Sequence, residues 1–155
     1  MTPERLLSTT LPFPYSYSQK VFEATKTIFN LVTCDNELEY KFAKFLEGSE
    51  DVAAFAKLSE QFSFSIEYPD SLSNLRYYYP DFVIKLNDGT HWLVETKGRE
   101  DIDVKRKDDA AQRWCNNATI LTGATWRYLK VPQNEFEKLH PTSFDELTSG
   151  LIIHS

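Results

Sequence analysis

Two carboxylates and a lysine lie within the most apolar part of the chain. Asp81 lies within a largely apolar run at 78–86, and Glu95 and Lys97 lie within a second run at 90–98, with Asn-Asp-Gly between the runs. β-Branched and aromatic residues dominate both runs, and Asn-Asp-Gly tolerates positive φ, so the sequence predicts a β-hairpin. Hard cations such as Mg2+ take oxygen ligands, usually one or two carboxylates with water and phosphate. These residue types therefore suit metal-assisted chemistry on a phosphate.

The register of this hairpin decides which side chains meet. If the turn is centred on Asp88, the numbers of opposed residues sum to 176, which places Asp81 opposite Glu95. Directly opposed residues share a face, and Lys97 lies one step further along that face. We therefore expect the three side chains to converge. Asp81 and Glu95 would hold the cation, and Lys97 would position the attacking water or offset charge on the phosphate.

Ordinary surface ion pairs are the alternative explanation for these three charges. Such pairs contribute only about 0–1 kcal/mol each. However, both faces of the hairpin carry apolar residues: Phe82, Ile84, Trp92 and Val94 on one face, and Val83 and Leu93 on the other. A sheet that is apolar on both faces is covered on both, and a buried carboxylate needs a metal or a charged partner. The metal site is therefore the favoured interpretation.

Composition indicates one globular domain that is not membrane-bound. The chain has 155 residues, of which 41% are apolar, enough for a substantial core. No signal-length or membrane-length apolar run occurs, and Cys34 and Cys115 are far apart, which predicts a cytoplasmic protein with reduced thiols. The three histidines have no ligand spacing, so zinc is not expected.

The charge balance is unusual for a protein that binds nucleic acid by itself. The net charge is −6, whereas a stand-alone binder is usually basic. Any affinity for DNA is therefore expected to come largely from a partner or a neighbouring domain.

Hydrophobic spacing predicts the elements around the hairpin. Residues 1–19 contain three prolines and are expected to form an arm. Residues 20–148 are expected to form one domain, and residues 149–155 a tail. The stretch 20–33 mixes helix and strand signals. Helices are expected at 37–48 after an Asp35 or Asn36 cap, at 51–58, at 103–118, at 133–139 and at 144–147, and further strands at 62–68 and 126–131. These elements predict an α/β fold.

Two of these helices carry further candidates for the site. Glu39 lies beside the apolar stripe of its helix and can reach the edge of the sheet, although a solvated glutamate fits the pattern equally well. Lys107 shares the apolar face of its helix and is expected to point at the site. Lys105 suits a solvated charge or a phosphate contact, and Gln112 lies one step off the stripe. Lys105, Lys107 and Gln112 are expected to make weak DNA contacts.

The order of these residues resembles the PD-(D/E)XK nuclease superfamily, in which a helix glutamate precedes a Pro-Asp strand and a Glu-x-Lys strand. Here these are Glu39, Pro80-Asp81 and Glu95-Thr96-Lys97. The segments 36–39, 64–68, 79–82, 95–98 and 110–115 make roughly residues 20–148 similar to the C-terminal endonuclease domain of the restriction subunit of type III restriction enzymes.

This resemblance implies a central mixed sheet of about four to five strands flanked by helices on both faces. It also implies Mg2+-dependent cleavage of double-stranded DNA, with Mn2+ as a substitute ion. Asp81, Glu95 and Glu39 would be metal ligands, and Lys97 would assist the water. The implied partners are an ATP-driven helicase-like motor and a methyltransferase subunit of a phage-defence system.

The sequence contains no Gly-x-x-x-x-Gly-Lys-[Ser/Thr] phosphate loop, so it provides no such route to ATP hydrolysis.

Two other functions stay open at this point. One alternative is a nuclease-like module that binds DNA or protein without cutting. The other is cleavage of RNA, because the phosphodiester chemistry is the same.

Overall fold

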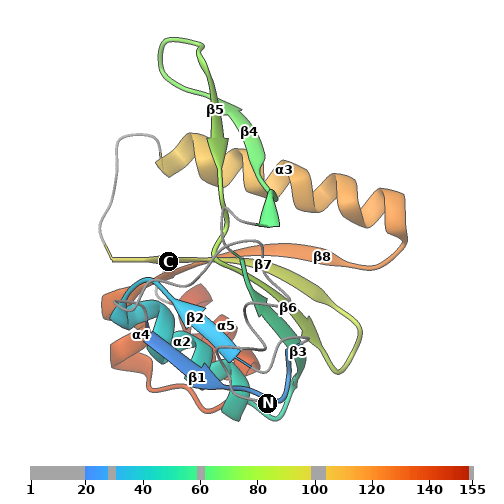
Figure 1. The fold of residues 1–155 in the computed structure, drawn as a ribbon. Helices are drawn as coiled ribbons and strands as arrows, with labels where there is room; N and C mark the ends of the chain where they lie inside the picture. The colour runs from blue at the N-terminus through green and yellow to red at the C-terminus, as the bar shows by residue number, and fades with distance from the viewer. Residues whose placement is uncertain (1–19, 28–30, 59–61, 99–103, 154–155) are drawn as a thin grey trace.

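A four-stranded mixed sheet lies at the centre of the chain (Figure 1). The computed structural model describes residues 20–27, 31–58, 62–98 and 104–153, and the predicted arm at 1–19 lies outside them. The sheet has the order β3 (Val52–Lys57), β6 (Phe82–Leu86), β7 (His91–Lys97) and β8 (Trp126–Pro132). The first three are antiparallel neighbours, whereas β8 runs parallel to β7. The predicted α/β fold with a mixed central sheet is confirmed.

Helices cover both faces of this sheet, as predicted. On one side lie α2 (Glu37–Gly48), α4 (Gln133–Leu139) and α5 (Phe144–Ile153), and on the other lies α3 (Val104–Thr122) (Figure 1). The larger core, on the α2 side, contains the fully buried Phe42, Phe82 and Phe144. The smaller core packs Leu93 of β7 against Ala111 and Cys115 of α3.

Local signals account for α2. The Asn36 side chain accepts a hydrogen bond from the Glu39 N–H at 2.9 Å, which satisfies one of the backbone donors that every helix start leaves open. Leu38, Phe42 and Leu46 recur every four residues and are buried, so one face of the helix packs on the sheet. The helix ends at Gly48, as its sequence predicts.

The register predicted for the central hairpin is confirmed. Val83 pairs with Leu93 and Ile84 with Trp92. Gly89 has φ +88°, a conformation that glycine adopts without steric cost. Asp81 lies directly before β6, and its N–H donates to the Val94 carbonyl at 3.2 Å. Backbone hydrogen bonding between the two arms of the hairpin therefore continues as far as Asp81.

The helix predicted at 51–58 is wrong, because these residues form β3. Alanine favours a helix locally, and the run at 52–57 is rich in alanine. Pairing with β6 overrides that preference, since it places Phe55 opposite Ile84 in the core. A short apolar run cannot be assigned by periodicity alone.

The predicted strand at 62–68 does not belong to the central sheet. Instead, β4 (Ile66–Pro69) pairs with β5 (Leu75–Tyr78) in a separate hairpin that projects past α3 (Figure 1). The first arm of the predicted central hairpin is also divided, because β5 ends at Tyr78 and β6 begins at Phe82. Pro80 lies in this gap and has no N–H to donate to a strand pair.

The remaining predicted elements agree with the structure more closely. The ambiguous stretch 20–33 contains β1 (Lys20–Glu23) and part of β2 (Leu31–Cys34), which pair antiparallel. The predicted helix at 144–147 is longer and extends to Ile153. Both cysteines are buried free thiols. Among the helices that the structure describes, none is long and apolar enough to cross a membrane.

Candidate active site

Asp81 is held at the end of the β6–β7 pair. Its Oδ2 accepts hydrogen bonds from the backbone N–H and the hydroxyl of Thr96, both at 2.8 Å. The last paired residues of the two strands are Phe82 and Val94. Beyond this pair, the Asp81 carboxylate accepts the hydrogen bond of the β7 backbone in place of a β6 carbonyl. Thr96 is buried, so these two bonds fix the Asp81 carboxylate at the edge of the core, next to Glu95.

Glu95 lies close to Asp81 and to two lysines. Burial raises the pKa of Glu95 to about 8, and the charge of Asp81 adds to the shift. The hydroxyl of Tyr78, which donates to Glu95 Oε2 at 2.9 Å, and the charges of Lys97 and Lys107 act in the opposite direction on this pKa. Glu95, Lys97 and Lys107 also line one small cavity of about 10 Å³. The structure thus places Asp81, Lys97 and Lys107 within electrostatic reach of Glu95.

Glu39 is buried and lies within the electrostatic reach of Asp81. Only 5% of its surface is exposed, and its Oε2 accepts a hydrogen bond from the Asp35 N–H at 2.7 Å. Burial raises the pKa of Glu39, Lys57 lowers it, and the charge of Asp81 raises it. Of the two interpretations open for this residue, a solvated glutamate is therefore wrong.

Lys57 is a charged residue of this region that the sequence interpretation missed. Its side chain is 7% exposed, and its Nζ lies 3.7 Å from Glu39 Oε2. The same Nζ donates to the Leu58 carbonyl at 2.6 Å and lies 5.7 Å from the centre of the Phe82 ring. A strand assignment for 52–57 would have revealed it, because alternation places Lys57 on the same face as the apolar Phe55.

The carboxylates of this region suit a hydrated cation better than an all-protein metal cage. Across the described ranges, no three His, Cys, Asp or Glu side chains are grouped so as to hold a metal ion. Mg2+ commonly uses only one or two carboxylates and keeps several waters. The repulsion between Asp81 and Glu95 is what a shared cation would relieve. The residues present therefore fit an Mg2+ ion held by Asp81 and Glu95, while Glu39 has Lys57 as its counter-ion.

The residues expected to contact DNA differ in their distance from this site. Lys107 is half-buried beside Glu95, with its Nζ 6.0 Å from the centre of the Tyr68 ring. Lys105 is exposed near the start of α3. Gln112 donates to Asn116 at 3.1 Å and lines a separate pocket of about 660 Å³. Lys107 thus belongs to the site region, whereas Gln112 does not.

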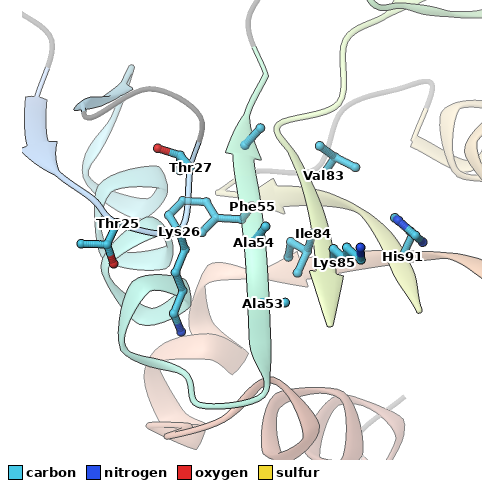
Figure 2. A pocket seen from close by; sticks show the side chains of 11 residues that line it. Thr25, Lys26, Thr27, Ala53, Ala54, Phe55, Val83, Ile84, Lys85 and His91 are labelled. Carbon is cyan, nitrogen blue, oxygen red and sulfur yellow. The ribbon is translucent and has the colours of Figure 1, made fainter. Parts of the chain in front are cut away.

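A further pocket lies along β3 and β6 (Figure 2). It has a volume of about 430 Å³, and its floor is formed by the small side chains of β3 and by Val83 and Lys85 of β6. Val83 alternates with the buried Phe82 and Ile84, so it lies on the face where Asp81 is expected. The charged residues that line the pocket are Lys26 and Lys85, with His91 beside them.

Comparison with known families identifies a match for most of the chain. Residues 25–138 match the family described as endonuclease domain. The matched region contains Glu39, Asp81, Glu95 and Lys97 and all four strands of the central sheet. A comparison with curated proteins finds no match.

Proposed function

The chain belongs to the endonuclease-domain family, and from this premise we propose that it is a metal-dependent nuclease that hydrolyses phosphodiester bonds of double-stranded DNA. The observation that supports this proposal is the grouping of Asp81, Glu95 and Lys97 at the paired ends of β6 and β7. Family membership supports a nuclease, and the arrangement of these three residues supports metal-assisted hydrolysis.

Each residue of the site has a distinct role in the proposed reaction. Asp81 and Glu95 would hold Mg2+, or Mn2+ in its place, and such an ion polarises a phosphoryl oxygen and lowers the pKa of a bound water. Lys97 orients the attacking water and offsets the negative charge that develops on the phosphate. Lys107 adds a second positive charge on the same side of Glu95. Glu39 is the helix acid that supports the site beside Asp81.

The setting of the reaction is part of the same proposal. The sequence similarity to type III restriction subunits supports a cleavage module in a cytoplasmic phage-defence system. An ATP-driven motor and a methyltransferase would then deliver the DNA and select the target. The net charge of −6 supports this dependence on partners, because an acidic chain attracts DNA poorly.

Nicking of supercoiled plasmid tests the proposed function. The chain should nick DNA with Mg2+ or Mn2+ and should be inactive in EDTA, and Asp81→Asn should remove the activity. Asp109→Asn is the matched control, because Asp109 is an exposed aspartate on α3. Cleavage of an RNA substrate in preference to plasmid would favour the RNA alternative. DNA binding without cleavage under any metal condition would favour the non-cleaving module.

A further inference from the structure

The hydroxyls of the buried Tyr78 and the half-buried Tyr128 lie between Glu95 and helix α3. Tyr78 at the end of β5 is 4% exposed, and its hydroxyl donates to Glu95 Oε2 at 2.9 Å. The Tyr128 hydroxyl of β8 donates to Asp108 Oδ1 of α3 at 2.7 Å. The two tyrosine hydroxyls interact with each other as neighbouring polar groups. The proposed metal ligand is thereby connected to three other elements.

Asp108 is a fixed end for this chain of hydroxyls. Its second oxygen, Oδ2, accepts from Lys130 Nζ at 2.8 Å. Tyr128 and Lys130 are two residues apart on β8, so they project from the same face of the strand. Both oxygens of Asp108 are thus held by one strand. The first turns of α3 and the Tyr128 hydroxyl therefore keep a constant position relative to β8.

We propose that Tyr78 is a positioning residue for Glu95, and that the Tyr128 hydroxyl, which is fixed by Asp108, supports the Tyr78 hydroxyl from its other side. This inference rests on the proposed function, because orientation matters only if Glu95 binds the cation. Groups that hydrogen-bond to metal ligands set the orientation of those ligands, and removing one typically weakens metal binding about 10–100-fold.

The surroundings of the two phenols keep them available as donors. Burial raises the pKa of Tyr78 and of Tyr128, which favours the protonated phenol over the phenolate. The Tyr78 ring packs in the smaller core with Ile66 and Tyr68. A ring fixed by packing can place its hydroxyl at one point, which an exposed and rotating side chain cannot do.

A role confined to core packing is the competing explanation, and Tyr78→Phe separates the two. Phenylalanine keeps the ring in the core and removes only the donor to Glu95. Tyr77→Phe is the matched control, because Tyr77 is the preceding residue of β5 and is 53% exposed. Tyr128→Phe removes the next hydroxyl of the chain without touching Glu95 directly.

Calorimetric titration of the DNA-free chain with Mn2+ provides the first readout. Tyr78→Phe should weaken Mn2+ binding about 10–100-fold, Tyr128→Phe should weaken it less, and Tyr77→Phe should leave it unchanged. The second readout is a metal-free crystal structure of Tyr78→Phe, in which the Glu95 carboxylate should have moved from its wild-type position. This readout does not depend on the activity of the metal-loaded protein.

The possible outcomes distinguish this inference from the proposed function. Unchanged Mn2+ affinity in Tyr78→Phe, with Glu95 in its original position, overturns the positioning role and leaves the nuclease proposal intact. A wild-type chain that neither binds Mn2+ nor nicks plasmid overturns the proposed function. In that case the position of Glu95 in the Tyr78→Phe structure still decides whether Tyr78 positions the Glu95 side chain. If Tyr78→Phe does not fold, the same two measurements on Tyr128→Phe decide the inference.

Discussion

Replacing Lys57 by methionine removes the counter-ion of Glu39 and keeps most of the buried aliphatic volume. The two side chains are each 7% exposed and 3.7 Å apart, and removing one partner of such a buried pair costs about 3–5 kcal/mol. Protonation of Glu39 limits this cost. A carboxyl group with an ordinary pKa of 4.5 takes up a proton at pH 7 for about 3 kcal/mol. We therefore expect Lys57→Met to lower the free energy of unfolding by about 3 kcal/mol at pH 7.

The loss of stability should depend on pH in a defined direction. Burial already raises the pKa of Glu39, and Lys57 opposes the shift, so the pKa should rise further in Lys57→Met. A carboxyl whose pKa is raised by folding contributes stability that is fully present below its unfolded pKa and is lost as the pH rises through its folded pKa. The deficit of the variant should therefore be small near pH 4.5 and grow toward pH 7.

Urea unfolding in EDTA at pH 5 and pH 7 measures this deficit. Lys41→Met is the matched control, because Lys41 pairs with Glu137 at 3.8 Å on the surface, where the side chains are 52% and 45% exposed. A surface pair of this kind is worth less than about 1 kcal/mol. Adding Glu39→Gln to Lys57→Met should restore most of the lost stability. A deficit that is equal at both pH values, or no larger than that of Lys41→Met, would refute the reasoning.

Three further predictions concern the proposed catalytic residues and DNA. Because Glu95 has a raised pKa of about 8, metal-free wild type should lose more stability than Glu95→Gln as the pH rises from about 4.5 to about 8; the difference should reach about 5 kcal/mol at most. Parallel pH series of urea unfolding would show equal slopes if this is wrong. Lys97→Ala should abolish plasmid nicking and keep the parent melting temperature, and a collapse of folding would instead indicate a structural role. The isolated Asp81→Ala chain should bind duplex DNA weakly, with a shallow salt dependence of roughly −0.9 per phosphate contacted; tight binding with a steep slope in a fluorescence titration would contradict the proposed dependence on a partner.

Much of the site could be predicted from the sequence because its geometry is local. The two arms of the β6–β7 hairpin are separated by a short turn, and turn chemistry with a period of two is sufficient to define the register. That register brings Asp81 toward Glu95 and Lys97. The start of α2 is local as well, because the Asn36 side chain caps a helix that begins at the next residue.

Other features depend on residues that are far apart in the chain. The run at 52–57 has the composition of a helix, and only its pairing with β6, about 30 residues later, makes it a strand. The assignment of β4 to a separate hairpin likewise depended on β5 as its partner. Because a helix was predicted at 51–58 in place of β3, Lys57 was not recognised as the counter-ion of Glu39.

The sequence by itself determined the register of the central hairpin, and with it the places of Asp81, Glu95 and Lys97 along the two strands. Only the tertiary structure decided what surrounds them: Lys57 beside Glu39, and the hydroxyls of Tyr78 and Tyr128 between Glu95 and α3. The physical reason is that a buried charge or hydroxyl takes its partner from whichever element packs against it. Hydrophobic periodicity predicts that such elements pack, but it does not specify which polar atoms then come within hydrogen-bonding distance.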